Sequence, residues 1–130
     1  GILPLVASLP RISQHGDFAI NNLGVAGDHL VFFDWEDFGL ADLPGLDLAV
    51  LLLSVHDFDL WRLRSRLRSA SFESHLAHRL CERLHVPDDR FEQLLPAFLA
   101  LFVELKRGGG YDEASSDRAL AALRQWTDAP

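Results

Sequence analysis

Two polar residues near the start of the chain have side chains suited to phosphoryl transfer. Asp17 and Asn22 lie five positions apart in the segment QHGDFAINN, residues 14–22. This spacing places them neither on one face of a helix nor on one side of a strand, so we expect a compact loop to turn both side chains inward. Phosphoryl transfer needs a carboxylate to orient the attacking hydroxyl and take its proton, and it needs oxygen ligands for Mg²⁺ beside the nucleotide phosphates. Asp17 and Asn22 are residue types suited to these two tasks.

A further oxygen ligand follows at the end of a predicted strand. The apolar run LVFF, residues 30–33, directly precedes Asp34. Residues 23–25 and 30–33 flank a glycine-containing connection, AGDH, which has the length of a hairpin turn. An antiparallel return would carry Asn22 and Asp34 to the same edge of a two-stranded ribbon. The hairpin is therefore expected to bring two oxygen-bearing side chains together, and His29 in the turn is expected to be exposed to solvent.

The loop and the strand resemble those of small-molecule kinases of the aminoglycoside phosphotransferase and choline kinase type, which are distant relatives of the protein kinases. The resemblance implies that Asp17 is the catalytic base, that Asn22 and Asp34 bind Mg²⁺ and with it ATP, and that His15 supports the loop. Residues 34–49, DWEDFGLADLPGLDLA, resemble three further features of the family. These are an Asp-Trp-Glu segment, a Gly-x-x-Asp-Pro-like turn and an Asp-Leu-Ala that opens a helix.

The motif match covers about residues 9–53 and departs from the family pattern at residues 19–21, which read AIN where many relatives carry a glycine-rich or His-Pro-Gly-like stretch. Asp37 competes with Asp34 for the metal, since it opens the triplet D-F-G that binds metal in protein kinases. We prefer Asp34, because the end of a strand holds a ligand more rigidly than a loop position. Glu36 and Asp37 are expected to face the acceptor. Acidic side chains at the entrance to the site would suit a cationic acceptor such as an aminoglycoside or an amino alcohol. The general acidity of the chain accounts equally well for the presence of these acidic residues.

After the ribbon the sequence predicts helices. Residues 46–55 are apolar nearly all round and indicate a buried helix, with Asp47 near its N-terminus. Asp47 either stabilises that helix or, as the resemblance implies, braces the catalytic loop from behind; we favour structural roles for Asp42 and Asp47. Ser71 is expected to cap a helix that runs to about residue 85.

A long helix is predicted to begin after Asp88 or Asp89, with Asp89 and Glu92 at capping-box spacing and Pro96 kinking or restarting it. Residues 111–116 indicate a loop, and a last helix carries Leu120, Leu123 and Trp126. A length of 130 residues and 48% hydrophobic content fit one folded unit. The fold class predicted is α+β, mostly α-helical: the C-terminal lobe of a protein-kinase-like fold, with a small β-hairpin that carries the catalytic and metal loops.

The expected ATP-binding lobe has no counterpart in this sequence. A kinase-like fold needs an N-terminal sheet with a glycine-rich loop and a lysine on the phosphates. The only lysine is Lys106, within the predicted long helix, and the glycines at 108–110 follow a helix rather than open one. Since Gly1 is not a natural start and no methionine occurs, we expect residues 1–130 to be a C-terminal lobe whose N-terminal lobe has been lost or removed, and which is inactive by itself.

Charge and composition narrow the range of partners. The net charge is −7 and no dense basic run occurs, so we expect no nucleic-acid partner. The arginines at 62, 64, 66 and 68 are predicted to form a solvated helix face, and His75, His78, Glu82 and His85 an exposed polar face rather than a metal site. No apolar stretch is long enough for a membrane span, and the single cysteine fits a reducing compartment, so a cytoplasmic protein is expected.

The function predicted is therefore ATP- and Mg²⁺-dependent phosphorylation of a hydroxyl on a small molecule. Two alternatives stay open. The first is a kinase-like binding module without catalysis. The second is a metal-dependent phosphoester hydrolase that uses His15, Asp17 and Asp34 as ligands, although the sequence offers few further well-spaced histidines.

Overall fold

The computed structural model describes residues 2–108 and 113–127, which are mostly helical with one small sheet. This composition agrees with the α+β, mostly helical class predicted from the sequence. The elements in chain order are α1 (Ile2–Ser8), the 3₁₀ turn η1 (Ile20–Asn22), β1 (Leu23–Ala26), β2 (His29–Phe32), α2 (Leu46–Val55), α3 (Leu60–Leu67), α4 (Phe72–Leu84), α5 (Arg90–Gly108) and α6 (Glu113–Thr127).

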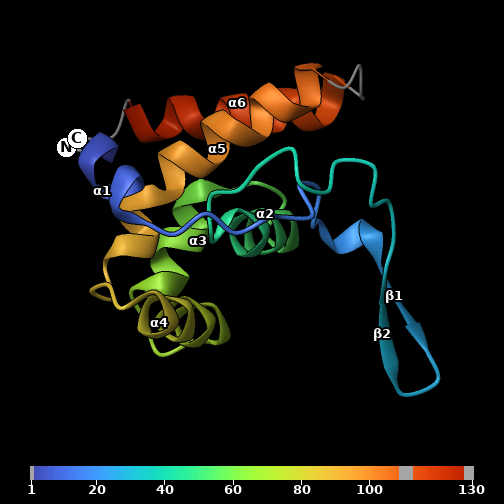
Figure 1. The fold of residues 1–130 in the computed structure, drawn as a ribbon, viewed down its shortest axis with the longest axis horizontal. Coiled ribbons are helices and arrows are strands. Elements are labelled where there is room, and N and C mark those ends of the chain that lie inside the picture. Colours follow the sequence, from blue (N-terminus) through green and yellow to red (C-terminus); the bar gives the residue numbers. More distant parts are fainter. Residues whose placement is uncertain (1, 109–112, 128–130) are drawn as a thin grey trace.

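The helices gather around α2 and α5. Figure 1 shows α2 near the middle of the helical body, with α5 and α6 side by side across one edge and α4 at the opposite end. The central side chains of α2 and the aromatic stripe of α5 are almost wholly buried: Leu46, Ala49, Val50, Leu52, Leu53, Phe91, Phe98 and Phe102. Because each large apolar side chain contributes roughly 1.5–3 kcal/mol when removed from water, this shared core fixes the two helices relative to each other.

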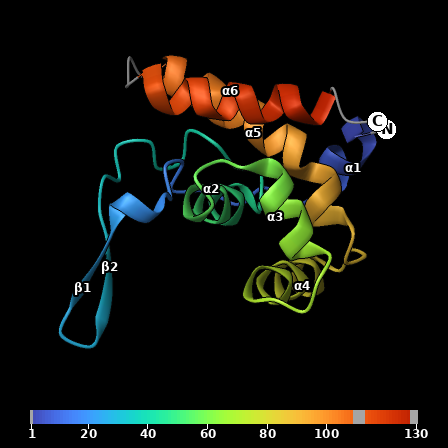
Figure 2. The ribbon, with the colours of Figure 1, turned by 180° about the vertical axis from the view of Figure 1, so that it is seen from behind.

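The predicted ribbon is present as a two-stranded antiparallel hairpin. Leu23 pairs with Phe32 and Ala26 pairs with His29, which leaves the two-residue turn Gly27-Asp28. Gly27 adopts a φ of +64°, a left-handed conformation that glycine reaches without strain. Figures 1 and 2 show the hairpin projecting away from the helical body. Asn22 directly precedes β1 and Phe33 directly follows β2, so both lie at the open end of the hairpin.

Helix boundaries agree with the sequence prediction in some places and differ in others. Ser71 caps α4 as predicted, and its hydroxyl accepts the backbone N–H of Ser74 at 3.1 Å. The predicted restart at Pro96 is wrong, because α5 continues through it as a single helix. The predicted pairing of Asp89 with Glu92 is also wrong, since the Glu92 carboxylate binds two arginines of the α3 region instead.

The predicted loop at residues 111–116 is corrected in part, since α6 already begins at Glu113. Residues 111 and 112 lie outside the described residues, as do residues 109, 110 and 128–130. Within the described helices, no segment combines the length and the apolar composition that a membrane crossing requires.

Candidate active site

The loop that carries Asp17 is fastened to the start of α2 by one carboxylate. Asp47 accepts the backbone N–H of His15 with Oδ2 at 2.8 Å and that of Gly16 with Oδ1 at 3.0 Å. In return, the backbone N–H of Asp47 donates to Oε1 of Gln14 at 3.1 Å. Of the two roles considered for Asp47, the structure therefore shows the brace behind the loop, and its place in the first turn of α2 also suits the helix dipole.

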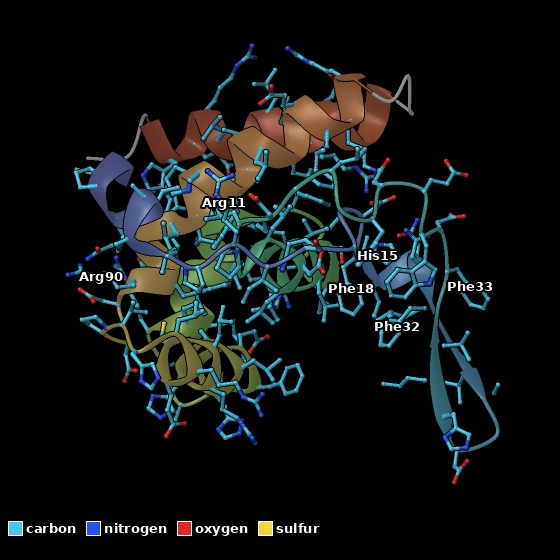
Figure 3. All side chains as sticks on the ribbon, viewed as in Figure 1. Arg11, His15, Phe18, Phe32, Phe33 and Arg90 are labelled. Atoms are coloured by element: carbon cyan, nitrogen blue, oxygen red, sulfur yellow. The ribbon has the colours of Figure 1, made fainter. Side chains whose placement is uncertain are left out.

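His15 connects the loop to the base of the hairpin through both ring nitrogens. Nδ1 accepts the backbone N–H of Asp17 at 3.1 Å, so the hydrogen must lie on Nε2, which donates to the carbonyl of Phe33 at 2.8 Å. The ring is buried and packs against Trp35 and Phe18, with ring centroids 4.6 and 5.7 Å away. Figure 3 shows His15, Phe18 and Phe32 grouped where the hairpin meets the helical body. These contacts fit the predicted supporting role.

Asp17 forms an ion pair that the sequence did not reveal. Its Oδ2 lies 2.7 Å from Nζ of Lys106, which comes from the C-terminal part of α5. The Lys106 side chain is 5% exposed and the Asp17 side chain 22% exposed. The other oxygen of Asp17, Oδ1, accepts no hydrogen bond from the part of the chain that the structure describes. One signal was available: Lys106 lies four residues after Phe102, which places it on the buried stripe of α5.

The hairpin brings Asn22 and Asp34 to neighbouring positions, as the predicted ribbon required. The carbonyl of Asn22 accepts the N–H of Phe33 at 2.8 Å, so Asp34 leaves the sheet beside the residue that enters it. The Asn22 side chain donates through Nδ2 to the carbonyl of Asp17 at 2.8 Å, while its Oδ1 accepts no hydrogen bond from any described residue. Asp34 is exposed, and its carboxylate pairs with no side chain among the described residues.

These two oxygen donors fit Mg²⁺ better than a metal that requires a full protein cage. The described residues contain no group of three or more His, Cys, Asp or Glu side chains that could hold a metal. Mg²⁺ typically binds through one or two protein oxygens and completes its shell with water and phosphate. Asn22 and Asp34 carry side-chain oxygens of the kind that such a site uses.

The two residues predicted to face the acceptor lie in different environments. Asp37 is buried against the Asp17 loop: a Cβ added to Gly16 would lie 2.9 Å from the Asp37 Cβ, and Gly16 has a φ of +93°. Gly16 therefore provides both the left-handed conformation and the space for this approach. Glu36, next to Asp37, is exposed.

The arginines expected to form a solvated face are mostly engaged in ion pairs, so that prediction is wrong for three of them. Arg64 and Arg68 donate to the carboxylate of Glu92 at 2.9 and 2.6 Å, and Arg66 donates to Glu73 at 3.1 Å. Burial alone would raise the pKa of Glu92, but the hydrogen bonds from Arg68 and Arg64 outweigh it and lower that pKa.

The polar face predicted on α4 is exposed, as expected: it comprises His75, His78, Glu82 and His85. One member, His78, contacts Asp88 at 2.9 Å. An open groove of about 940 Å³ lies beside this face, bordered by the α3–α4 connection, α4 and the start of α5. Its lining includes Arg66, His75 and Asp89 and none of the residues of the Asp17 loop.

No family model matches this chain, and no curated protein or solved structure matches it either. The resemblance to small-molecule kinases therefore rests on the residues of the loop and the hairpin.

Proposed function

We propose that this chain is the acceptor and magnesium half of an ATP-dependent phosphotransferase with a protein-kinase-like fold, acting on a hydroxyl of a small molecule. The observation that carries the proposal is the fastening of the Asp17 loop. Asp47 holds its backbone from α2, His15 ties it to the hairpin, and Asn22 binds the carbonyl of Asp17. This fastening, with Asn22 bonded to the same loop and Asp34 at the end of the hairpin, supports an assignment in which Asp17 acts together with two oxygen ligands, as phosphoryl transfer requires.

In this proposal each residue of the loop has one task. Asp17 accepts a hydrogen bond from the acceptor hydroxyl through Oδ1 and takes its proton as the oxygen attacks. Asn22 and Asp34 hold Mg²⁺, which when bound neutralises charge on the transferring phosphoryl group. His15 holds the loop against the base of the hairpin and transfers no proton in the reaction. A nucleotide-binding lobe would have to come from residues beyond these 130, since the sequence contains neither a phosphate-binding glycine loop nor a lysine on a strand.

Replacing Asp17 by asparagine in the protein as its gene encodes it tests this role. We expect Asp17→Asn to reduce ATP turnover by about 10²- to 10⁴-fold, because general-base catalysis contributes on that order. Fold and nucleotide affinity should be retained, as judged by circular dichroism and by titration with ATP. The matched control is Asp28→Asn in the hairpin turn, where the side chain is 92% exposed. Near-normal turnover of Asp17→Asn would refute the assignment of the base.

The acceptor is best identified by a direct screen. The protein is incubated with Mg-ATP and a panel of amino alcohols, aminoglycosides and neutral sugars, and each new phosphate ester is detected by ³¹P NMR. Phosphorylation of any hydroxyl compound, lost in Asp17→Asn, supports the proposal. ATP hydrolysis without ester formation for every acceptor would contradict it.

The Lys106–Asp17 ion pair favours a second candidate, a kinase-like binding module without catalysis. In that case the lysine neutralises the would-be base, and the protein binds nucleotide without turnover. The metal hydrolase considered from the sequence is disfavoured by geometry, because both ring nitrogens of His15 are already hydrogen-bonded and neither is available as a ligand.

A further inference from the structure

Helix α5 delivers a buried cation to the carboxylate at the centre of the proposed site. The Lys106 side chain is 5% exposed, its Nζ lies 2.7 Å from Oδ2 of Asp17, and the same Nζ lies 5.3 Å from the centre of the Phe102 ring. Burying an ammonium group is unfavourable unless an opposite charge compensates for it. The carboxylate of Asp17 provides such a charge, so the buried ammonium group and the carboxylate stabilise each other's positions.

We infer that Lys106 is a positioning residue for Asp17, a role that rests on the proposed phosphotransferase function. The ammonium group fixes one oxygen of the carboxylate, Oδ2, and so sets the rotation of the side chain. The other oxygen, Oδ1, has no hydrogen bond from the described residues and is presented to the acceptor hydroxyl. Each oxygen thus has one task.

The element that carries Lys106 is suited to this role. α5 is a long helix that packs along α6 and contributes Phe91, Phe98 and Phe102 to the core. A side chain based on such a helix is held more precisely than one based on a loop. The backbone beneath Asp17 is fixed independently by Asp47 on α2, so two different helices define the position and the direction of the carboxylate.

The same contact could instead block Asp17, and the two possibilities predict opposite changes in rate. A positioning cation makes turnover fall when it is removed, since a carboxylate that rotates freely is less often aligned with the hydroxyl. A blocking cation makes turnover rise when it is removed. The sign of the change therefore decides between them.

The test uses Lys106→Met in the protein as its gene encodes it, since methionine keeps an unbranched side chain and removes the charge. We expect kcat to fall about 10- to 100-fold while KM for the acceptor stays within about threefold. Lys106→Arg should recover part of the loss because it restores a cation. Arg107→Met is the matched control, because it removes an exposed cation from the same helix and should leave kcat unchanged.

A double-mutant cycle tests whether Lys106 acts through Asp17. In an Asp17→Asn background, the further change Lys106→Met should alter turnover by less than about threefold, since the side chain that it positions is gone. Full additivity of the two effects would overturn the inference, as would unchanged or increased kcat in Lys106→Met. Circular dichroism and thermal unfolding of each variant separate a loss of fold from a loss of alignment.

A separate measurement distinguishes failure of the inference from failure of the proposed function. If the wild-type protein phosphorylates no hydroxyl compound, the function fails and the positioning role fails with it. NMR of the Lys106 ammonium group then reports on the ion pair by itself. If its protons exchange slowly with water in the wild type and rapidly in Asp17→Asn, the ion pair forms in solution and its role is to stabilise the fold. If the wild-type protein is active and the cycle is additive, only the role of Lys106 is rejected.

Discussion

Asp47 holds the loop around Asp17 with the two oxygens of a single carboxylate. One oxygen takes the N–H of His15 and the other takes the N–H of Gly16. Both donors belong to a loop whose backbone cannot find helical or sheet partners at these positions. A residue that never touches a substrate thus determines where the proposed base stands.

Asp47→Asn should weaken this attachment, because an amide nitrogen in place of one oxygen faces a backbone N–H and leaves it without an acceptor. We expect the free energy of unfolding, measured with urea, to fall by about 1–3 kcal/mol, and turnover of the active protein to fall at least tenfold. Asp42→Asn is the control: its side chain is half exposed and 3.5 Å from Arg11, a pair worth under about 1 kcal/mol. If the two variants lose equal stability and equal turnover, the hydrogen bonds from Asp47 do not hold the Asp17 loop in place.

At the scale of residues, the sequence allowed part of the candidate site to be predicted. The short hairpin made it possible to expect Asn22 and Asp34 together, because an antiparallel return fixes the spacing of its two ends. The partner of Asp17 could not be predicted. Lys106 lies on another helix far along the chain, and periodicity shows which face of a helix is buried without showing what that face meets.

At the scale of elements, the same limit explains why the ion-pair partners of the arginines could not be predicted. The sequence indicated that the arginines of α3 lie on a polar helix face. It contained no information on the glutamates that α4 and α5 place opposite that face. Arg64 has the most enclosed position, between Glu92 and the rings of Trp61 and Trp126, with its guanidinium 5.1 and 4.7 Å from the two ring centres. Arg64 is therefore part of the contact between α3 and α5, whereas the side chains of Arg66 and Arg68 remain 47% and 60% exposed.

Glu92→Gln should loosen this interface between α3 and α5. The change removes the charge that binds Arg64 and Arg68, and we expect a loss of about 1–3 kcal/mol in the free energy of unfolding, measured with urea. Glu82→Gln, on the exposed face of α4, should change stability by less than about 0.5 kcal/mol. If the Glu92 variant is as stable as the Glu82 control, the ion pairs of Glu92 with Arg64 and Arg68 contribute nothing to the free energy of unfolding.

At the scale of the whole molecule, one buried carboxylate links three helical segments. Glu73 on α4 contacts His56 at the end of α2 at 2.8 Å and Arg66 of α3 at 3.1 Å. Burial alone would raise the pKa of Glu73, but hydrogen bonds from its own backbone N–H, His56 and Arg66 lower it to about 2. A carboxylate with a lowered pKa in the folded state makes stability depend on pH.

The direction of that dependence follows from the sign of the shift. The contribution of Glu73 is fully present above the ordinary glutamate pKa of 4.5 and is lost as the pH falls towards about 2. Urea unfolding of the wild type and of Glu73→Gln between pH 6 and pH 2.5 checks this. The difference in stability should be largest near pH 6 and shrink steadily below pH 4.5. A difference that stays constant across the range would exclude the linkage.

The backbone conformation at Asp34 favours one residue type for stability and another for the proposed function. Asp34 adopts a φ of +57°, a left-handed conformation that is less favourable for a side-chain-bearing residue than for glycine by about 1 kcal/mol. A library of variants selected only for thermal stability should therefore enrich glycine at this position. A library selected for phosphoryl transfer should retain a carboxylate there. A carboxylate recovered under the second selection and glycine under the first would show that Asp34 is kept for the reaction at a cost in stability.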